Sequence, residues 1–184
     1  ANKKLYRNLF SKADLVLVLS EQWRRWIKEA LGLTEHIEVL FNPCPMIEPK
    51  PELKQKEILF AGTVIPRKGY ADLIRGFSKI ASSFPDWKVV IAGNGEIDKA
   101  KAIAKECGIE KQVVFLGWVN GKAKDLAFQR ASIYCLASDG EGFPMGVLDA
   151  WAYGIPCVVT PVGGLPDIVV DGENALVFPV GDVD

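Results

Sequence analysis

Residues 133–160 read IYCLASDGEGFPMGVLDAWAYGIPCVVT, and this stretch decides the fold. Its first four residues, 133–136, and its last five, 156–160, are short apolar runs of strand length. Residues 145–153 between them are mostly apolar and long enough for a helix, while the glycines and the proline of residues 139–144 mark a loop. A strand, a loop, a helix and a second strand in this order predict a right-handed crossover between two parallel strands.

The same alternation of strands and helices continues along the rest of the chain. Further strands are expected at residues 15–19, 36–40, 58–62, 88–92, 112–116 and 175–178. Helices are expected at residues 69–83, 96–107 and 122–130, and the first has its apolar residues on one stripe, namely Tyr70, Leu73, Ile74, Phe77 and Ile80. Strands this short and apolar are typical of a sheet that is buried on both faces. We therefore expect an α/β fold with a Rossmann-like, doubly wound parallel sheet.

Composition and charge exclude several classes of protein. The chain has 184 residues, of which 49% are hydrophobic and 24% charged, which is typical of a globular protein and not of a disordered or fibrous one. Lys and Arg number 22 against 23 Asp and Glu, so we expect no nucleic-acid partner. The four cysteines have no C-x-x-C spacing and His36 is the only histidine, so we expect no metal site and reduced thiols, as in a cytoplasmic protein.

A change in composition divides the chain. Residues 41–56 read FNPCPMIEPKPELKQK, with four prolines and almost no periodicity, which predicts a linker that we place at residues 42–57. Residues 1–41 are too few to bury their own apolar faces, so we expect them to be the C-terminal remnant of a preceding domain that is missing here. Residues 58–184 form the main domain, which stops after a strand with no closing helix, and we therefore expect it to be truncated.

The loop after the strand at 58–62 contains the first candidate site residues. Ligands bind at the carboxyl ends of the strands in sheets of this kind. Gly62 permits a close approach of the backbone, and Arg67 and Lys68 stand just before a helix whose free N–H groups favour anions. This arrangement suits a phosphate, although the segment lacks the Gly-Lys-Ser/Thr of a P-loop. The alternative is a basic turn that is simply exposed to solvent.

Two carboxylates in and after the glycine-rich loop are the second candidates. Glu141 lies in this loop, and Asp149 follows eight positions later inside the expected helix. Backbone N–H groups of residues 143–146 would point at a bound molecule. Asp149 stands in an apolar run and needs a partner, for which a ribose diol is suitable. The alternative is that both acids are solvated.

Residues 141–179, EGFPMGVLDAWAYGIPCVVTPVGGLPDIVVDGENALVFP, resemble the C-terminal domain signature of GT-B glycosyltransferases of the family 4 type, also called glycosyl transferases group 1. Residues 60–69 and 115–119 are similar to the family's phosphate loop and base loop, and residues 41–43 to its interdomain hinge. The resemblance implies the C-terminal half of a GT-B two-domain fold. It also places Thr63 where the family usually has Arg, and Asp149 where it usually has a second Glu.

The resemblance further implies roles for individual residues. Lys68 and Glu141 would be catalytic, Lys68 by binding the donor's diphosphate and Glu141 by facing the transferred sugar. Asp149 would hold the ribose and Val119 would line the base. The other residues implied in binding the nucleotide sugar are Gly62, Thr63, Arg67, Gly142, Phe143, Pro144 and Met145, with the turn at Gly163 and Gly164 bordering the cleft.

The implied activity is transfer of a sugar, with retention of configuration, from a UDP-, GDP- or ADP-sugar to a hydroxyl of a glycan, a lipid or a small molecule. No cofactor or metal is expected, and the setting implied is polysaccharide biosynthesis in the cytoplasm. A sugar-nucleotide epimerase or a phosphorylase of the same fold, and a catalytically silent homologue that only binds nucleotide sugars, remain alternatives.

Trp23 and Trp26 share one face of a basic helix. We expect this face to pack against the missing domain, and the alternative is peripheral contact with the inner face of the membrane.

Overall fold

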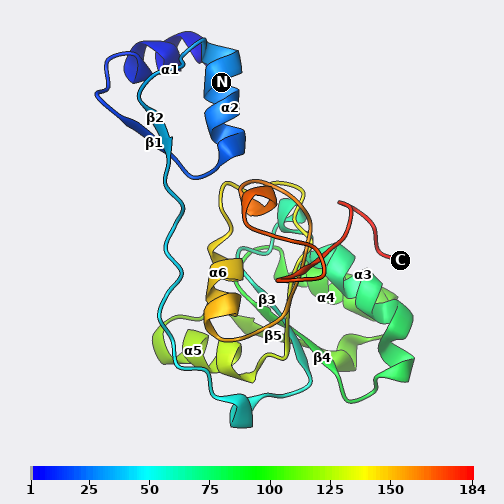
Figure 1. Cartoon of the computed structure of the whole chain (residues 1–184). Coiled ribbons are helices and arrows are strands. Elements are labelled where there is room, and N and C mark those ends of the chain that lie inside the picture. Colours follow the sequence, from blue (N-terminus) through cyan, green and yellow to red (C-terminus); the bar gives the residue numbers. More distant parts are fainter. Residues whose placement is uncertain (1) are drawn as a thin grey trace.

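A computed structural model describes residues 2–184, which form a small N-terminal unit, an extended connection and a larger sheet domain (Figure 1). The small unit contains α1 (Lys3–Phe10), β1 (Val16–Val18), α2 (Glu21–Leu31) and β2 (Ile37–Val39). Its two strands pair in parallel, and its buried apolar side chains are Ile27, Leu31 and Ile37. Residues 40–50 then run without helix or strand to a 3-10 turn at Pro51–Leu53.

The sheet domain is built on six parallel strands. They are β3 (Glu57–Ala61), β4 (Lys88–Ala92), β5 (Val113–Gly117), β6 (Ile133–Leu136), β7 (Cys157–Val159) and β8 (Leu176–Val177). Their order across the sheet is β5-β4-β3-β6-β7-β8. The chain therefore starts in the middle, winds outward to β5, returns to β6 beside β3 and winds outward again. This confirms the expected doubly wound α/β fold, and its switch point lies between β3 and β6.

Helices cover both faces of the sheet (Figure 1). The helices α3 (Tyr70–Ile80) and α4 (Ile97–Glu106) lie on one face, and α5 (Gly121–Arg130) and α6 (Met145–Ala152) on the other. Successive residues of a strand serve opposite faces, so Leu59 packs in the cluster with Phe128 of α5, and Phe60 packs in the cluster with Ile74 of α3. This double burial explains why the strands read as continuous apolar runs.

All eight expected strands are present, with ends that differ by at most two residues from the expected ones. The helix expected at 69–83 ends as an α-helix at Ile80 and continues as a 3-10 turn, Ala81–Ser83. Of the apolar stripe on this helix, Tyr70, Leu73, Ile74 and Phe77 are buried. No helix within residues 2–184 combines the length and the apolar composition needed to cross a membrane.

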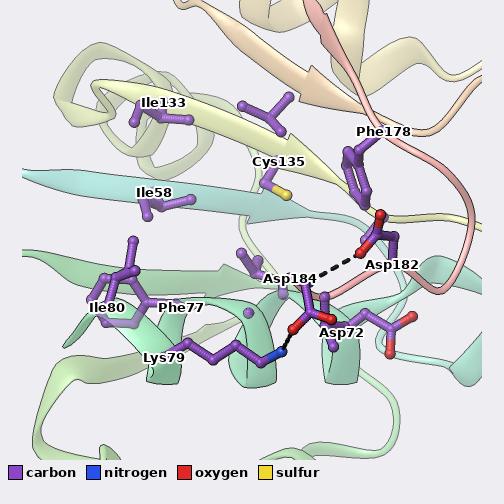
Figure 2. Close-up of a pocket in the computed structure, with 15 residues that line it drawn as sticks. Ile58, Asp72, Phe77, Lys79, Ile80, Ile133, Cys135, Phe178, Asp182 and Asp184 are labelled. Carbon is purple, nitrogen blue, oxygen red and sulfur yellow. Dashed lines mark hydrogen bonds and ion pairs between the residues drawn. The ribbon is translucent and has the colours of Figure 1, made fainter.

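Ile80, the last residue of this stripe, is exposed. Its side chain is exposed at the end of α3, at the rim of an apolar groove (Figure 2). The groove lies between α3 and the sheet, and Ile58, Ile133 and Phe178 also line it. The C-terminal residues run along its edge, where Asp184 forms an ion pair with Lys79 (Figure 2). In the last turn of α3, Phe77 packs in the core, whereas Ile80 at the end of that turn is exposed.

Two cysteines are buried in the core as free thiols. Cys135 lies in β6 and Cys157 in β7. Burial raises the pKa of each thiol from 9.0 to about 12, because the charged thiolate would lose its solvation. Cys44, in contrast, is exposed.

Burial of these thiols predicts selective alkylation. Iodoacetamide should label Cys44 in the folded protein and should label Cys135 and Cys157 only after denaturation, because their raised pKa leaves about a thousandfold less thiolate. Peptide mass spectrometry after timed labelling measures this, with Cys44→Ser as the control for the fast site. Fast labelling of Cys135 without denaturant would contradict the described packing.

The free energy of unfolding should also fall as the pH rises from 9.0 toward 12, because the unfolded chain releases thiol protons that the folded chain keeps.

Candidate functional site

A cavity of about 550 Å³ opens at the switch point of the sheet. Three loops supply its walls, each following the carboxyl end of a strand. The loop after β3 contributes Thr63 and Lys68, the loop after β5 leads into α5 with Lys124, and the loop after β6 leads into α6 with Glu141 and Asp149. Ligands bind at this place in doubly wound sheets.

Lys68 and Glu141 form the central ion pair of the cavity. The Lys68 Nζ lies 2.7 Å from Oε1 and 2.8 Å from Oε2 of Glu141. The Glu141 side chain is only 6% exposed and that of Lys68 is 21% exposed. The buried Ser138 hydroxyl also lies 2.7 Å from Oε1 of Glu141. A carboxylate so far from water needs such partners, and here a cation and a hydroxyl supply them.

The two loops meet because a glycine lets them cross. Gly69 has a φ of 68°, and a Cβ there would lie 1.8 Å from the carbonyl oxygen of Ala137. Next to this crossing, the Asp139 amide donates to the Arg67 carbonyl at 2.9 Å, and the Ser138 hydroxyl oxygen lies 2.8 Å from the same carbonyl oxygen. These contacts hold Lys68 beside Glu141, although 73 residues separate them in sequence.

Asp149 and Lys124 form a second ion pair in the cavity. The Lys124 Nζ lies 2.7 Å from Oδ2 of Asp149, whose side chain is 15% exposed. The ammonium group also lies 5.6 Å from the centre of the Phe128 ring, one helical turn further along α5. The partner that an acid in this apolar run requires is therefore a lysine of the neighbouring helix. Sequence reasoning treated residues 122–130 only as an amphipathic helix and missed Lys124.

Tyr134 forms part of the cavity floor. Its hydroxyl donates to the Ala61 carbonyl at 3.4 Å, and burial raises the pKa of this phenol far above its usual range. Gly146 at the start of α6 packs closely against this hydroxyl, since a Cβ at position 146 would lie 2.0 Å from the hydroxyl oxygen. Pro144 precedes the helix, and no side chain caps its first amides. The N-terminus of α6 therefore faces the cavity with free donors.

Most of the residues expected in the site line this one cavity. They are Gly62, Thr63, Lys68, Val119, Glu141, Phe143, Pro144, Met145 and Asp149. Arg67 does not line it, because its guanidinium turns to the Gly140 carbonyl. The guanidinium lies 3.9 Å from Oε2 of Glu141. Gly142 instead lines a separate, mostly apolar cavity together with Trp23 and Trp26 of the small unit. Within residues 2–184, no three His, Cys, Asp or Glu side chains gather to form a metal site.

The turn at Gly163 and Gly164 supports the glycine-rich loop from behind. The Gly164 amide donates to the Gly142 carbonyl at 3.0 Å. Gly163 has a φ of 62°, and a Cβ there would lie 2.4 Å from the carbonyl oxygen of Glu141. This turn does not line the cavity, but it determines how far the backbone of Glu141 can move away from Lys68.

The small unit touches the same region of the sheet domain. The backbone amide of Glu21, at the start of α2, donates to Oδ2 of Asp167 at 2.6 Å. The rings of Phe41 and Phe143 lie 5.8 Å apart. The N-terminal unit is therefore seated beside the loop that contains Glu141.

The close contact at Gly163 predicts a stability difference between two glycine variants. Gly163→Ala should lower the free energy of unfolding by about 2–4 kcal/mol, because it adds a methyl group against the Glu141 carbonyl to the cost of a positive φ. Gly172→Ala is the matched control, since Gly172 has a φ of 75° and open space around it, and should lose about 1 kcal/mol. Urea unfolding measures both variants. Equal losses would show that the turn does not support the loop as described.

The chain matches known proteins over most of its length. The sequence pattern of the family Glycosyl transferases group 1 matches residues 46–184. The phosphatidyl-myo-inositol mannosyltransferase of Mycolicibacterium smegmatis is 29% identical over 91% of this chain and 45% of the relative. The lipopolysaccharide 1,6-galactosyltransferase of Salmonella typhimurium is 27% identical over 98% of this chain and 52% of the relative. The chain thus spans about half the length of these curated relatives.

Solved structures agree with the fold. The lipopolysaccharide outer core galactosyltransferase WaaB, in its apo form, superimposes with a TM-score of 0.76 at 27% identity, over 94% of this chain and 50% of that one. The HepE protein of Anabaena in complex with UDP gives a TM-score of 0.87 at 19% identity, over 99% of this chain and 54% of that one, and shows the fold alone. Because the family pattern covers well over half of its residues, the chain belongs to the Glycosyl transferases group 1 family, and its fold is that of the GT-B glycosyltransferases.

Proposed function

We propose that this chain supplies the donor site of a glycosyltransferase that moves a sugar from a nucleoside-diphosphate sugar to a hydroxyl group, with retention of configuration. The observation that carries the proposal is the Lys68–Glu141 ion pair, 2.7 Å long, inside the cavity at the switch point of the sheet. It puts a cation and a carboxylate side by side at the place where such a donor would react. Family membership supports the same reaction class.

Lys68 is the proposed phosphate-binding residue. Cleavage of the donor leaves a nucleoside diphosphate, on which negative charge develops as the sugar departs. A lysine fixed by the loop crossing stabilises this charge without first having to move into place. The uncapped N-terminus of α6 adds backbone donors on the same side.

Glu141 is the proposed sugar-facing residue. Positive charge develops at the anomeric carbon during glycosyl transfer, and a carboxylate beside the sugar stabilises it. Ser138 and Lys68 hold the Glu141 side chain, and the Gly163 turn holds its backbone. The residue is thus fixed before a substrate arrives, which is what electrostatic stabilisation requires.

Asp149 and the loop before α5 are the proposed nucleoside-binding residues. The Asp149 carboxylate faces the cavity and can accept hydrogen bonds from a ribose diol. Val119 and Trp118 line the same end of the cavity, and Trp118 is largely exposed, so its ring is free to contact a base. Arg67 and Gly142 border this site on its outer side and stay proposed donor contacts.

The acceptor is proposed to bind on the side of the small unit. We assign residues 1–41 to the acceptor domain, residues 42–57 to the linker and residues 58–184 to the donor domain. The names of two relatives, a lipopolysaccharide galactosyltransferase and a phosphatidyl-myo-inositol mannosyltransferase, support a glycan or lipid acceptor. We propose a cytoplasmic enzyme of polysaccharide biosynthesis.

A catalytically silent nucleotide-sugar-binding homologue is the second candidate. Thr63 favours it, because this exposed, neutral side chain lines the cavity beside Lys68 and adds no positive charge for a diphosphate. A sugar-nucleotide epimerase would differ from both in its product. Turnover of a donor by the full-length protein, with analysis of the product's configuration, distinguishes the three functions.

The proposed function predicts that Lys68→Ala and Glu141→Ala in the full-length protein each lower donor turnover at least about tenfold, on the order of 1.4 kcal/mol of transition-state stabilisation. Lys56→Ala is the control, because Lys56 forms an ion pair with Asp86 at an exposed position and does not line the cavity. Initial rates with radiolabelled UDP-, GDP- and ADP-sugars measure the effect. Near-normal rates for both site variants would refute the assignment of the site.

The proposed donor site also predicts saturable binding of one nucleoside diphosphate. Calorimetric titration with UDP, GDP and ADP should show one preferred nucleotide, and Lys68→Ala should weaken its binding by about tenfold. The titration is made with this chain and with the full-length protein, and only the latter is expected to transfer sugar, because domain closure completes the site. Absence of binding by the folded full-length protein would contradict a donor site.

A further inference from the structure

Two lysines line the cavity, one from the loop after β3 and the other from α5. Among the described lining residues, Lys68 and Lys124 are the cations, and Glu141 and Asp149 are the anions. Each lysine lies 2.7 Å from a carboxylate oxygen, so the cavity contains two ion pairs and no net charge. A ligand with its own negative charges therefore competes with these carboxylates for the two lysines.

The proposed donor has one negative charge on each of its two phosphates. If Lys68 binds the phosphate that bears the sugar, the phosphate next to the nucleoside also needs a cation, since burying it beside neutral groups is costly. Arg67 turns outward to the Gly140 carbonyl. Lys124 is the remaining cation of the cavity lining.

Lys124 is placed at the nucleoside end of the cavity. Its ammonium group lies within hydrogen-bond distance of Asp149, the residue proposed to hold the ribose. The phosphate next to the nucleoside is attached to that same ribose through its 5′ carbon. A lysine that reaches the ribose-binding carboxylate can thus reach this phosphate by rotating its own side chain. Its side chain is 43% exposed, twice the 21% of Lys68, and it therefore has room to rotate.

We propose that Lys124 is a donor-binding residue that exchanges partners when the nucleotide enters. In the empty cavity it neutralises Asp149, and in the complex it binds the phosphate next to the nucleoside and leaves Asp149 to the ribose hydroxyls. This inference rests on the proposed function. It assigns to the lysine of α5 the second positive charge that Thr63 does not supply.

The test compares nucleotides with nucleosides. Full-length protein is titrated with UDP, GDP and ADP and with uridine, guanosine and adenosine. Lys124→Met and Lys124→Gln should weaken diphosphate binding about tenfold and leave nucleoside binding unchanged or stronger. The Gln variant keeps a hydrogen-bond donor for Asp149, so it tests the loss of the positive charge even if the Met variant fails to fold. Lys122→Met, on an exposed residue of the same helix that does not line the cavity, should change neither.

Two results would overturn the inference alone. If the wild-type protein binds a nucleotide and both Lys124 variants bind it equally well, Lys124 has no phosphate to bind. If both variants weaken nucleoside and diphosphate binding by the same factor, Lys124 only positions Asp149. Absence of nucleotide binding and turnover in the wild-type protein would instead refute the proposed function, and this inference with it.

Discussion

The approach of Gly69 to the Ala137 carbonyl is the contact on which the site depends. The loops after β3 and β6 can cross there because a side chain is absent, and the hydrogen bond from the Asp139 amide to the Arg67 carbonyl then fixes the crossing. Lys68 and Glu141 lie on either side of this point. Their ion pair is therefore a product of backbone geometry, and the electrostatics of the cavity follows from close packing at the centre of the sheet.

Much of the fold could be predicted from the sequence because the sheet is buried on both faces. Strands such as Lys88–Ala92 and Ile133–Leu136 are short apolar runs in the sequence, and they can be recognised without knowing which strands pair with them. Both were expected with these bounds. Ile80 shows the limit of periodicity. A helical stripe predicts which residues share a face, but it does not predict how closely each of them packs on the sheet, and Ile80 lies exposed at the rim of a groove between α3 and the sheet.

The candidate site could be predicted only in part. Lys68, Glu141 and Asp149 follow the carboxyl ends of strands, and a topological rule together with a family resemblance was enough to select them. Lys124 and Ser138 were missed, because each matters through a partner whose position depends on how two elements pack. A basic residue within the first turn or two of a helix that follows a strand is the pattern that would have found Lys124, since that end of the helix shares the edge with the other loops.

The bond between the Glu21 amide and Asp167 has a consequence for motion. Within residues 2–184 it is the one hydrogen bond that joins the small unit to the sheet domain, and the segment at 40–50 between them contains no helix or strand. A hydrogen bond to a charged acceptor contributes about 1.5–3 kcal/mol. Its formation or loss thus changes the ratio of molecules with the small unit docked on the sheet domain to molecules with it undocked by about ten- to a hundredfold. The Asp167 carboxylate can therefore govern how often the small unit leaves its place beside the Glu141 loop.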